Sequence, residues 1–188
     1  MTHKFSPDVI NRVASILKCD VPAILAVIQV EAAGDGFLPD GRPKILFERH
    51  IFSRLTERKF NVIDPAVSNK VAGGYVGGAG EYSRLYRAAQ LDADAAVQSA
   101  SWGACQIMGF NWKMTGEKSL IGFLLAMHNG VDAHLHLFAQ YILAAGLADE
   151  LREHRWADFA RKYNGPAYAS NKYDTKLAAA HAAQTGVA

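Results

Sequence analysis

The chain has 188 residues and a mass of 20.4 kDa, which fits one domain. Half of its residues are apolar or aromatic and a fifth are charged, a balance that supports a buried core and excludes a disordered chain. Lysine and arginine number 20 against 18 acidic residues, and the net charge of +2 is too small and too scattered for a dedicated nucleic-acid binder. We therefore expect a single globular domain over residues 1–188, monomeric and without a nucleic-acid partner.

The apolar stretches at residues 120–127 and 135–148 fall short of the roughly 18 to 20 residues that a membrane-spanning helix needs, so no membrane insertion is expected. The N-terminus leads into a polar helix start instead of the apolar core of a signal peptide, which predicts synthesis in the cytoplasm. Cys19 and Cys105 form no C-x-x-C pair. This excludes a disulfide framework and a multi-cysteine zinc site, and predicts two free thiols.

Helix-start signals and apolar spacing predict the elements in chain order. Ser6 followed by Pro7 is typical of a helix N-cap, and Asp20 followed by Pro22 repeats the pattern. The first helix is predicted to reach about Cys19, and the second to run until the glycines at 34 and 36. A short apolar run at 44–47 suits a strand, and 61–80 is predicted to be a long glycine-rich surface excursion. Further helical patterns cover 49–59, 81–89, a segment from Asp92 or Asp94 to 100, 102–108 with an interruption at Gly103, 119–129, 131–145, 148–154, 156–163 and 173–183. The fold class is therefore predicted to be mainly α with one small strand region.

Glu31 occupies a position where an aliphatic residue belongs. At 100° per residue it lies within about 100° of Ile24, Val27 and Ile28, on the face that the second helix buries. Burial and the negative end of the helix dipole both raise the pKa of a carboxyl group, which predicts a proton donor near neutral pH. The alternative is a buried glutamate that pairs with an arginine.

Two segments combine polar hydrogen-bonding groups with aromatic surfaces, as sugar binding requires. Residues 101–109, SWGACQIMG, place a hydroxyl, an indole, a glycine and an amide close together. Residues 163–168, YNGPAY, repeat these groups in a loop. The glycine turn at 34–37 suits a close approach by a ligand, although alone it indicates only the end of a helix.

Other catalytic patterns are weak. His134 and His136 lie on different faces of one predicted helix, so a zinc amidase site is not expected. Ser101 lacks the G-x-S-x-G context of a nucleophile, and the glycines at 73–78 lack the lysine of a phosphate loop. We expect no metal and no cofactor.

Five ordered segments between residues 20 and 180 resemble the N-acetylmuramidase catalytic domain of phage and prophage endolysins: QVEAAGDGF, KILFERHIF, GGYVGGAGEY, SWGACQIMGFN and YNGPAYASNKYDTKLAAA. A more distant similarity extends to goose-type lysozymes and soluble lytic transglycosylases, through Glu31 and the Ser-x-Gly-x-x-Gln pattern of Ser101, Gly103 and Gln106. The resemblance implies a single lysozyme-like helical domain with a long glycine-rich loop, and Glu31 as the catalytic acid. The sequence departs from its relatives at Ala32-Ala33, where they often carry Ser-Gly or Ser-Ala; this affects local substrate contacts and leaves the acid in place.

The resemblance also implies a reaction and a setting. The reaction is hydrolysis of the β-1,4 bond between N-acetylmuramic acid and N-acetylglucosamine in the glycan strands of bacterial peptidoglycan. The setting is lysis of a phage-infected cell, in which the protein reaches the wall after holin-type release. Three alternatives stay open: a lytic transglycosylase that forms 1,6-anhydro ends, a non-catalytic peptidoglycan-binding module, and a membrane-disrupting helical protein.

Glycoside hydrolysis commonly uses a second carboxylate. Glu48 is the candidate, as a base for water, a substrate ligand or half of an ion pair with Arg49. Glu81 is a weaker alternative, because capping explains its place at a helix start, and Asp35 and Asp64 are weaker still. The predicted substrate-binding residues are Ser101, Trp102, Gln106, Tyr163, Asn164 and Tyr168; a role in the core explains Trp102 equally well.

Overall fold

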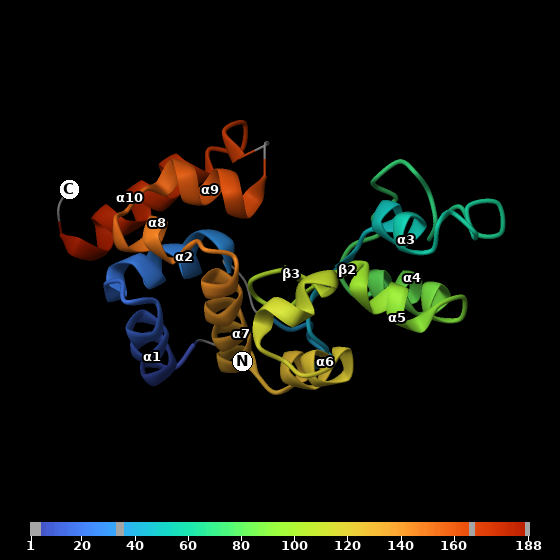
Figure 1. Cartoon of the computed structure of the whole chain (residues 1–188), viewed down its shortest axis with the longest axis horizontal. Coiled ribbons are helices and arrows are strands. Elements are labelled where there is room, and N and C mark those ends of the chain that lie inside the picture. The colour runs from blue at the N-terminus through green and yellow to red at the C-terminus, as the bar shows by residue number, and fades with distance from the viewer. Residues whose placement is uncertain (1–4, 33–35, 166–167, 187–188) are drawn as a thin grey trace.

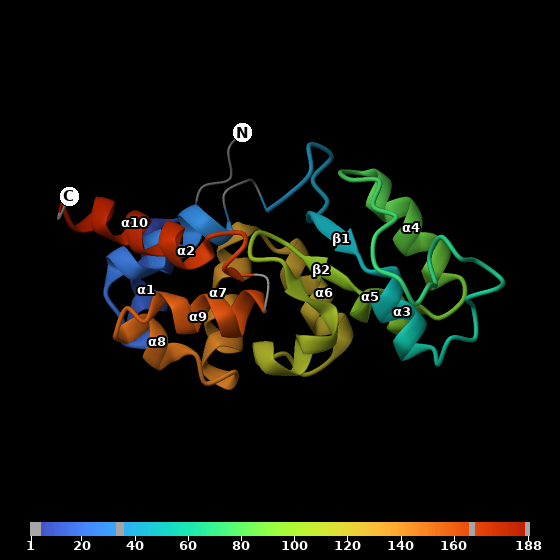
Figure 2. The ribbon, with the colours of Figure 1, turned by 90° about the horizontal axis from the view of Figure 1, so that it is seen from above.

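The computed structural model describes residues 5–32, 36–165 and 168–186. They form two groups of helices joined by a small sheet (Figures 1 and 2). The larger group contains α1 (Pro7–Leu17), α2 (Val21–Glu31), α7 (Val131–Ala144), α8 (Ala148–Arg152), α9 (Trp156–Asn164) and α10 (Tyr173–Thr185). The smaller group contains α3 (Arg49–Leu55), α4 (Gly80–Ala89) and α5 (Ala93–Gln98). Near the junction lie α6 (Leu120–His128) and the 3₁₀ helix η1 (Gly109–Thr115).

The sheet has three short antiparallel strands in the order β1-β2-β3, namely β1 (Ile45–Phe47), β2 (Ala100–Trp102) and β3 (Ile107–Met108). Ile45 pairs with Trp102 and Ser101 pairs with Met108. β2 and β3 form a tight hairpin, whose turn is residues 103–106. The strands β1 and β2 therefore lie where the chain passes between the two groups of helices.

The predicted N-caps Ser6 and Asp20 are confirmed, and Asp92 and Ser119 cap two further helices in the same way. The side chain of each N-cap residue accepts a hydrogen bond from the backbone N–H three residues later, which satisfies a donor that the first turn leaves free. The donor–acceptor distances are 3.2 Å for Ser6, 2.8 Å for Asp20, 2.9 Å for Asp92 and 2.9 Å for Ser119. Asp92 is thus the cap of α5, which decides between the two predicted starts of that helix.

The predicted mainly α, lysozyme-like fold class is confirmed, and most predicted helices lie within a few residues of the observed ones. Residues 61–80 contain no helix or strand before α4 begins at Gly80, as expected. The helical interpretation of residues 102–108 is wrong, because this segment is the β2–β3 hairpin. The third helix ends at Leu55, four residues before the predicted end. The predicted glycine stop at Gly34 lies outside the described residues.

His134 of α7 packs against the hairpin turn and forms a hydrogen bond with it. Its side chain is fully buried, its Nδ1 accepts the Ala104 N–H at 3.1 Å, and its Nε2 lies 2.7 Å from the Met127 carbonyl, to which it donates. The imidazole is therefore neutral, and burial lowers its pKa. Gly103 has φ +71°, and a Cβ there would lie 2.8 Å from His134 Nδ1, so this turn requires glycine.

We expect the stability contributed by His134 to depend on pH. Because its folded-state pKa is depressed, the unfolded chain binds an extra proton below the unfolded value of about 6.5. The contribution is complete above that pH and is lost as the pH falls toward the folded-state pKa. His134→Gln should lower the free energy of unfolding by roughly 1 to 3 kcal/mol at pH 8. In urea unfolding, the difference in this free energy between wild type and variant should become smaller as the pH is lowered from 7 to 5. A difference in unfolding free energy that stays constant over this range would contradict a lowered pKa for His134 in the folded state.

Among the described residues, no single helix has the length and apolar character needed to cross a bilayer. Among the helices that the structure describes, one pair, α1 and α2, meets the length and composition test when taken together, and the pair is bent by 111° at the break between them.

Candidate active site

A cavity of about 820 Å³ lies where the sheet meets the two groups of helices. Its walls include the C-terminal ends of α2 and α9, strand β1, the β2–β3 hairpin and the start of η1. Glu31 and Glu48 both line it. The cavity thus joins segments that are far apart in the sequence and contains two carboxyl groups.

Glu31 is the last residue of α2 and is partly buried. Asn164, the last residue of α9, donates from Nδ2 to Glu31 Oε1 at 2.9 Å. Burial raises the pKa of Glu31 above its ordinary value, and the Asn164 hydrogen bond and the charge of Lys176 oppose this rise without cancelling it. Within the described part of the chain, no lysine or arginine forms an ion pair with Glu31, so a glutamate clamped by arginine does not describe this residue.

The hairpin turn holds two of the predicted sugar ligands against each other. Ser101 Oγ donates to Gln106 Oε1 at 2.7 Å, and Gln106 Nε2 donates to the Gly103 carbonyl at 2.8 Å. Gln106 itself has φ +49°, a left-handed conformation that is uncommon for a residue with a side chain. Both side chains line the cavity, and their amide and hydroxyl groups are oriented before any ligand arrives.

Tyr163 connects α9 to the same turn. Its hydroxyl donates to the Cys105 carbonyl at 2.8 Å, and its ring stacks on Phe159 at a centroid distance of 5.4 Å. Burial raises the pKa of Tyr163 well above its ordinary value, so the phenol stays protonated and keeps this hydrogen bond. Tyr163 and Asn164 together fix the end of α9 to the hairpin and to Glu31.

Glu48 stands between β1 and α3 on the wall of the cavity. The Tyr75 hydroxyl lies 2.9 Å from each of its carboxylate oxygens, and His50 Nδ1 lies 3.1 Å from Oε2. The pairing with Arg49 that the sequence allowed does not form: Arg49 instead donates to the carbonyls of Val71 and Ala72. Glu48 is therefore held by the glycine-rich loop through Tyr75.

Glu81, the weaker catalytic alternative, is not in the cavity. Its side chain is fully buried and pairs with Arg84 at 2.8 Å. It also accepts the backbone N–H groups of Phe47, Val76 and Gly77. Burial favours a raised pKa, yet these donors win and the pKa of Glu81 is lowered. The structure thus gives Glu81 a role in holding β1 and the glycine-rich loop together.

Trp102 lies in the core and not on the cavity wall. Only 2% of its surface is exposed, and its indole N–H donates to the Val97 carbonyl at 3.0 Å. Its ring meets Phe123 edge to face. A buried indole offers no face to a sugar, so the predicted role as a platform does not agree with the structure.

Of the remaining candidates, Tyr168 and Asp64 do not line the cavity, and Asp35 is not among the residues that the structure describes. Tyr168 is partly buried against the core and is not among the residues that line the cavity. Asp64 forms a two-pronged pair with Arg87 at 3.1 and 2.8 Å. Asp35 lies outside the described residues.

Sequence reasoning missed several aromatic and amide side chains that line the cavity, namely Phe110, Asn111, Tyr141 and Tyr173. They come from η1, α7 and α10, and Tyr141 in particular belongs to an ordinary helical pattern that gives no local sign of a binding role. The quoted segments do contain three of these residues: SWGACQIMGFN ends with Phe110 and Asn111, and YNGPAYASNKYDTKLAAA includes Tyr173.

Comparisons with known proteins identify the family of the chain. A family model for N-acetylmuramidase matches residues 20–185. The solved structure of an endolysin from Burkholderia phage AP3 superposes with a TM-score of 0.90 at 43% sequence identity, covering 95% of this chain and 70% of that chain. No curated protein matches the sequence. The chain therefore belongs to the N-acetylmuramidase family, the glycoside hydrolases that act on peptidoglycan.

Proposed function

We propose that Glu31 is the general acid that cleaves the β-1,4 bond between N-acetylmuramic acid and N-acetylglucosamine. The observation that carries the proposal is a partly buried carboxyl group with a raised pKa, which ends a helix on the wall of an 820 Å³ cavity. Asn164 occupies Oε1, and within the described residues Oε2 accepts no hydrogen bond, so Oε2 is available to hold the proton. Glu31 then protonates the bridging oxygen as the C–O bond breaks and an oxocarbenium-like state develops.

The glycan strand would lie along the hairpin. Ser101 and Gln106 offer fixed hydrogen-bonding groups, while the rings of Tyr141 and Tyr173, which also line the cavity, offer apolar surface. This combination of polar groups and flat apolar rings matches the hydroxyls and the apolar faces of a pyranose ring. This arrangement favours binding to an extended sugar chain over binding to a peptide.

We propose Glu48 as the second carboxylate, which removes a proton from the water that adds to the anomeric carbon. Its support is its place on the wall of the same cavity, with Tyr75 donating to it. Glu48→Gln should lower the rate of wall clearing by roughly 10²-fold or more and leave the melting temperature close to that of wild type. Near-normal clearing combined with a lower melting temperature would instead assign Glu48 a structural role.

Asn164 provides a test of the acid through its pKa. Because the Asn164 hydrogen bond lowers the pKa of Glu31, Asn164→Ala should raise it. The acid must be protonated to act, so the alkaline limb of the pH profile of kcat/KM should move to higher pH. Asn111→Ala is the matched control: it also removes an amide from the cavity wall, but among the described residues the hydrogen bond to Glu31 comes from Asn164 and not from Asn111. A limb that moves equally in both variants, or to lower pH in Asn164→Ala, would contradict the proposal.

Product analysis distinguishes hydrolysis from the transglycosylase alternative. Purified sacculi digested with the protein should release muropeptides with reducing N-acetylmuramic acid ends. Mass spectrometry would identify 1,6-anhydro ends by the loss of one water. Binding to sacculi without any released sugar would indicate a wall-binding module.

We further propose that the protein is a monomer that lyses a phage-infected host after a holin-type membrane lesion. The similarity to a phage endolysin supports this setting. Cells that produce the protein in the cytoplasm should lyse only when a holin is co-expressed, and size-exclusion chromatography should give the mass of one chain.

A further inference from the structure

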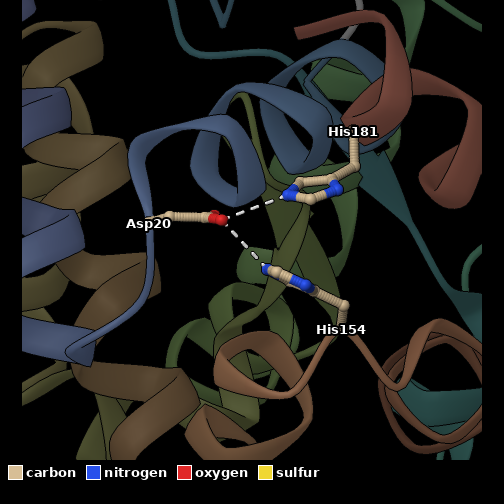
Figure 3. Close-up of side chains that lie close together, drawn as sticks. All are labelled: Asp20, His154 and His181. Atoms are coloured by element: carbon tan, nitrogen blue, oxygen red, sulfur yellow. Dashed lines mark hydrogen bonds and ion pairs between the residues drawn. The ribbon is translucent and has the colours of Figure 1, made fainter. Parts of the chain in front are cut away.

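A second convergence of side chains lies away from the cavity, where three separate segments meet (Figure 3). Asp20 precedes α2, His154 lies between α8 and α9, and His181 belongs to α10. Asp20 Oδ2 is 3.1 Å from His154 Nε2 and 3.2 Å from His181 Nε2. The three potential ligand atoms all lie within 4.8 Å of one another.

The spacing of these atoms suits a small divalent ion. Zn²⁺ binds imidazole nitrogen at about 2.0 to 2.1 Å and carboxylate oxygen at about 2.0 to 2.2 Å, usually in tetrahedral geometry. Tetrahedral ligands at those bond lengths are separated by about 3.3 to 3.5 Å. The two measured oxygen–nitrogen separations are within a few tenths of an ångström of this value. Two imidazoles and one carboxylate are also a donor set that zinc commonly takes, with a fourth position left for water.

The ligand atoms are oriented by their surroundings. Asp20 Oδ1 accepts the Ala23 N–H at 2.8 Å, which turns Oδ2 toward the two histidines. Trp156 packs against both imidazoles, at centroid distances of 5.5 Å to His154 and 5.3 Å to His181. Such supporting contacts fix ligand direction in metal sites.

We propose that His154 Nε2, His181 Nε2 and Asp20 Oδ2 form a Zn²⁺ site with one position open to solvent. Exposed fractions of 37% for the His154 side chain and 42% for that of Asp20 leave a path for the ion. The ion joins the start of α2, the start of α9 and the C-terminal half of α10. Glu31 lies at the other end of α2, so the site stabilises the larger group of helices without entering the chemistry.

The test uses the full chain, freed of metal by dialysis against a chelator, and Zn²⁺ alone as the titrant. Calorimetry should give one ion per chain, and the melting temperature should rise with Zn²⁺ concentration. His154→Ala and His181→Ala should each weaken binding by more than about tenfold and abolish the thermal shift. His136→Ala, which removes an exposed histidine of α7 outside the cluster, is the matched control and should bind as wild type does.

Cobalt provides an independent readout of the ligands. Co²⁺ in place of Zn²⁺ should show the visible bands of a tetrahedral nitrogen and oxygen site, with no thiolate charge-transfer band from the neighbouring Cys19. The proposal is overturned if Zn²⁺ does not bind at one ion per chain, if either alanine variant binds as wild type does, or if a thiolate band dominates. In the first case the three side chains are only a hydrogen-bonded ion-pair cluster.

Discussion

Glu31→Gln is expected to reduce the rate of peptidoglycan hydrolysis by roughly 10² to 10⁴-fold, the usual contribution of a positioned general acid. Glutamine keeps the size of the side chain and can still pair with Asn164, so the cavity wall is preserved. What it lacks is a proton that can be transferred to the bridging oxygen. The measurement is the initial rate of turbidity loss of purified sacculi, with sacculus pull-down to confirm that the variant still binds.

The control for this prediction is Glu57→Gln, which changes the same residue type away from the cavity. The Glu57 side chain is 79% exposed and makes only a loose pair with Lys59 at 3.6 Å. Its clearing rate should equal that of wild type. Clearing by Glu31→Gln at the rate of the Glu57 variant would remove Glu31 from the mechanism.

Glu81→Gln should have the largest effect on stability, a loss of about 3 to 5 kcal/mol in the free energy of unfolding. The substitution removes the buried negative charge and leaves the Arg84 guanidinium, only 5% exposed, without its ionic partner. The carboxylate of Glu81 accepts hydrogen bonds from three backbone N–H groups. The glutamine amide that replaces it has one oxygen that can accept these bonds and one nitrogen that cannot. Urea unfolding monitored by circular dichroism gives the free energy.

Glu57→Gln serves again as the reference, because its surface ion pair should contribute less than about 1 kcal/mol. Arg84→Met with Glu81→Gln gives a further check, since removing both charges should recover part of the loss. A Glu81 variant as stable as wild type would show that the loop and β1 do not depend on this carboxylate.

The sequence predicted best what depends on neighbours along the chain. Ser6 and Asp20, the two predicted N-caps, each cap a helix through an N–H three residues away, so a short pattern contains the whole interaction. The β2–β3 hairpin has strands of only three and two residues, too short to show an alternating pattern. Its conformation depends on His134, about 30 residues later, which no local pattern reveals.

The same distinction applies to the site. Glu31 could be predicted because an acid on an apolar helix face is a local anomaly, and the raised pKa agrees with that prediction. Its partner Asn164 is 133 residues away in the chain. Trp102 and Glu81 carry site-like chemistry, yet both are buried, and only the packing of α4, α6 and the sheet around them decides that. Residue type thus indicated the chemistry, while tertiary contacts decided which residues reach the cavity.

The hairpin turn at 103–106 is tied to α7 through Ala104, to α9 through Cys105, and to itself through Gln106, while its strands pair with β1. The hairpin is thereby anchored to two different helices and to β1 before a glycan strand binds. Binding then costs little ordering entropy, because the partners of the sugar are already in position. We accordingly expect the hairpin turn to be preorganised for a long glycan strand. Hydrogen exchange of the turn amides should therefore be equally slow in the free and the glycan-bound protein.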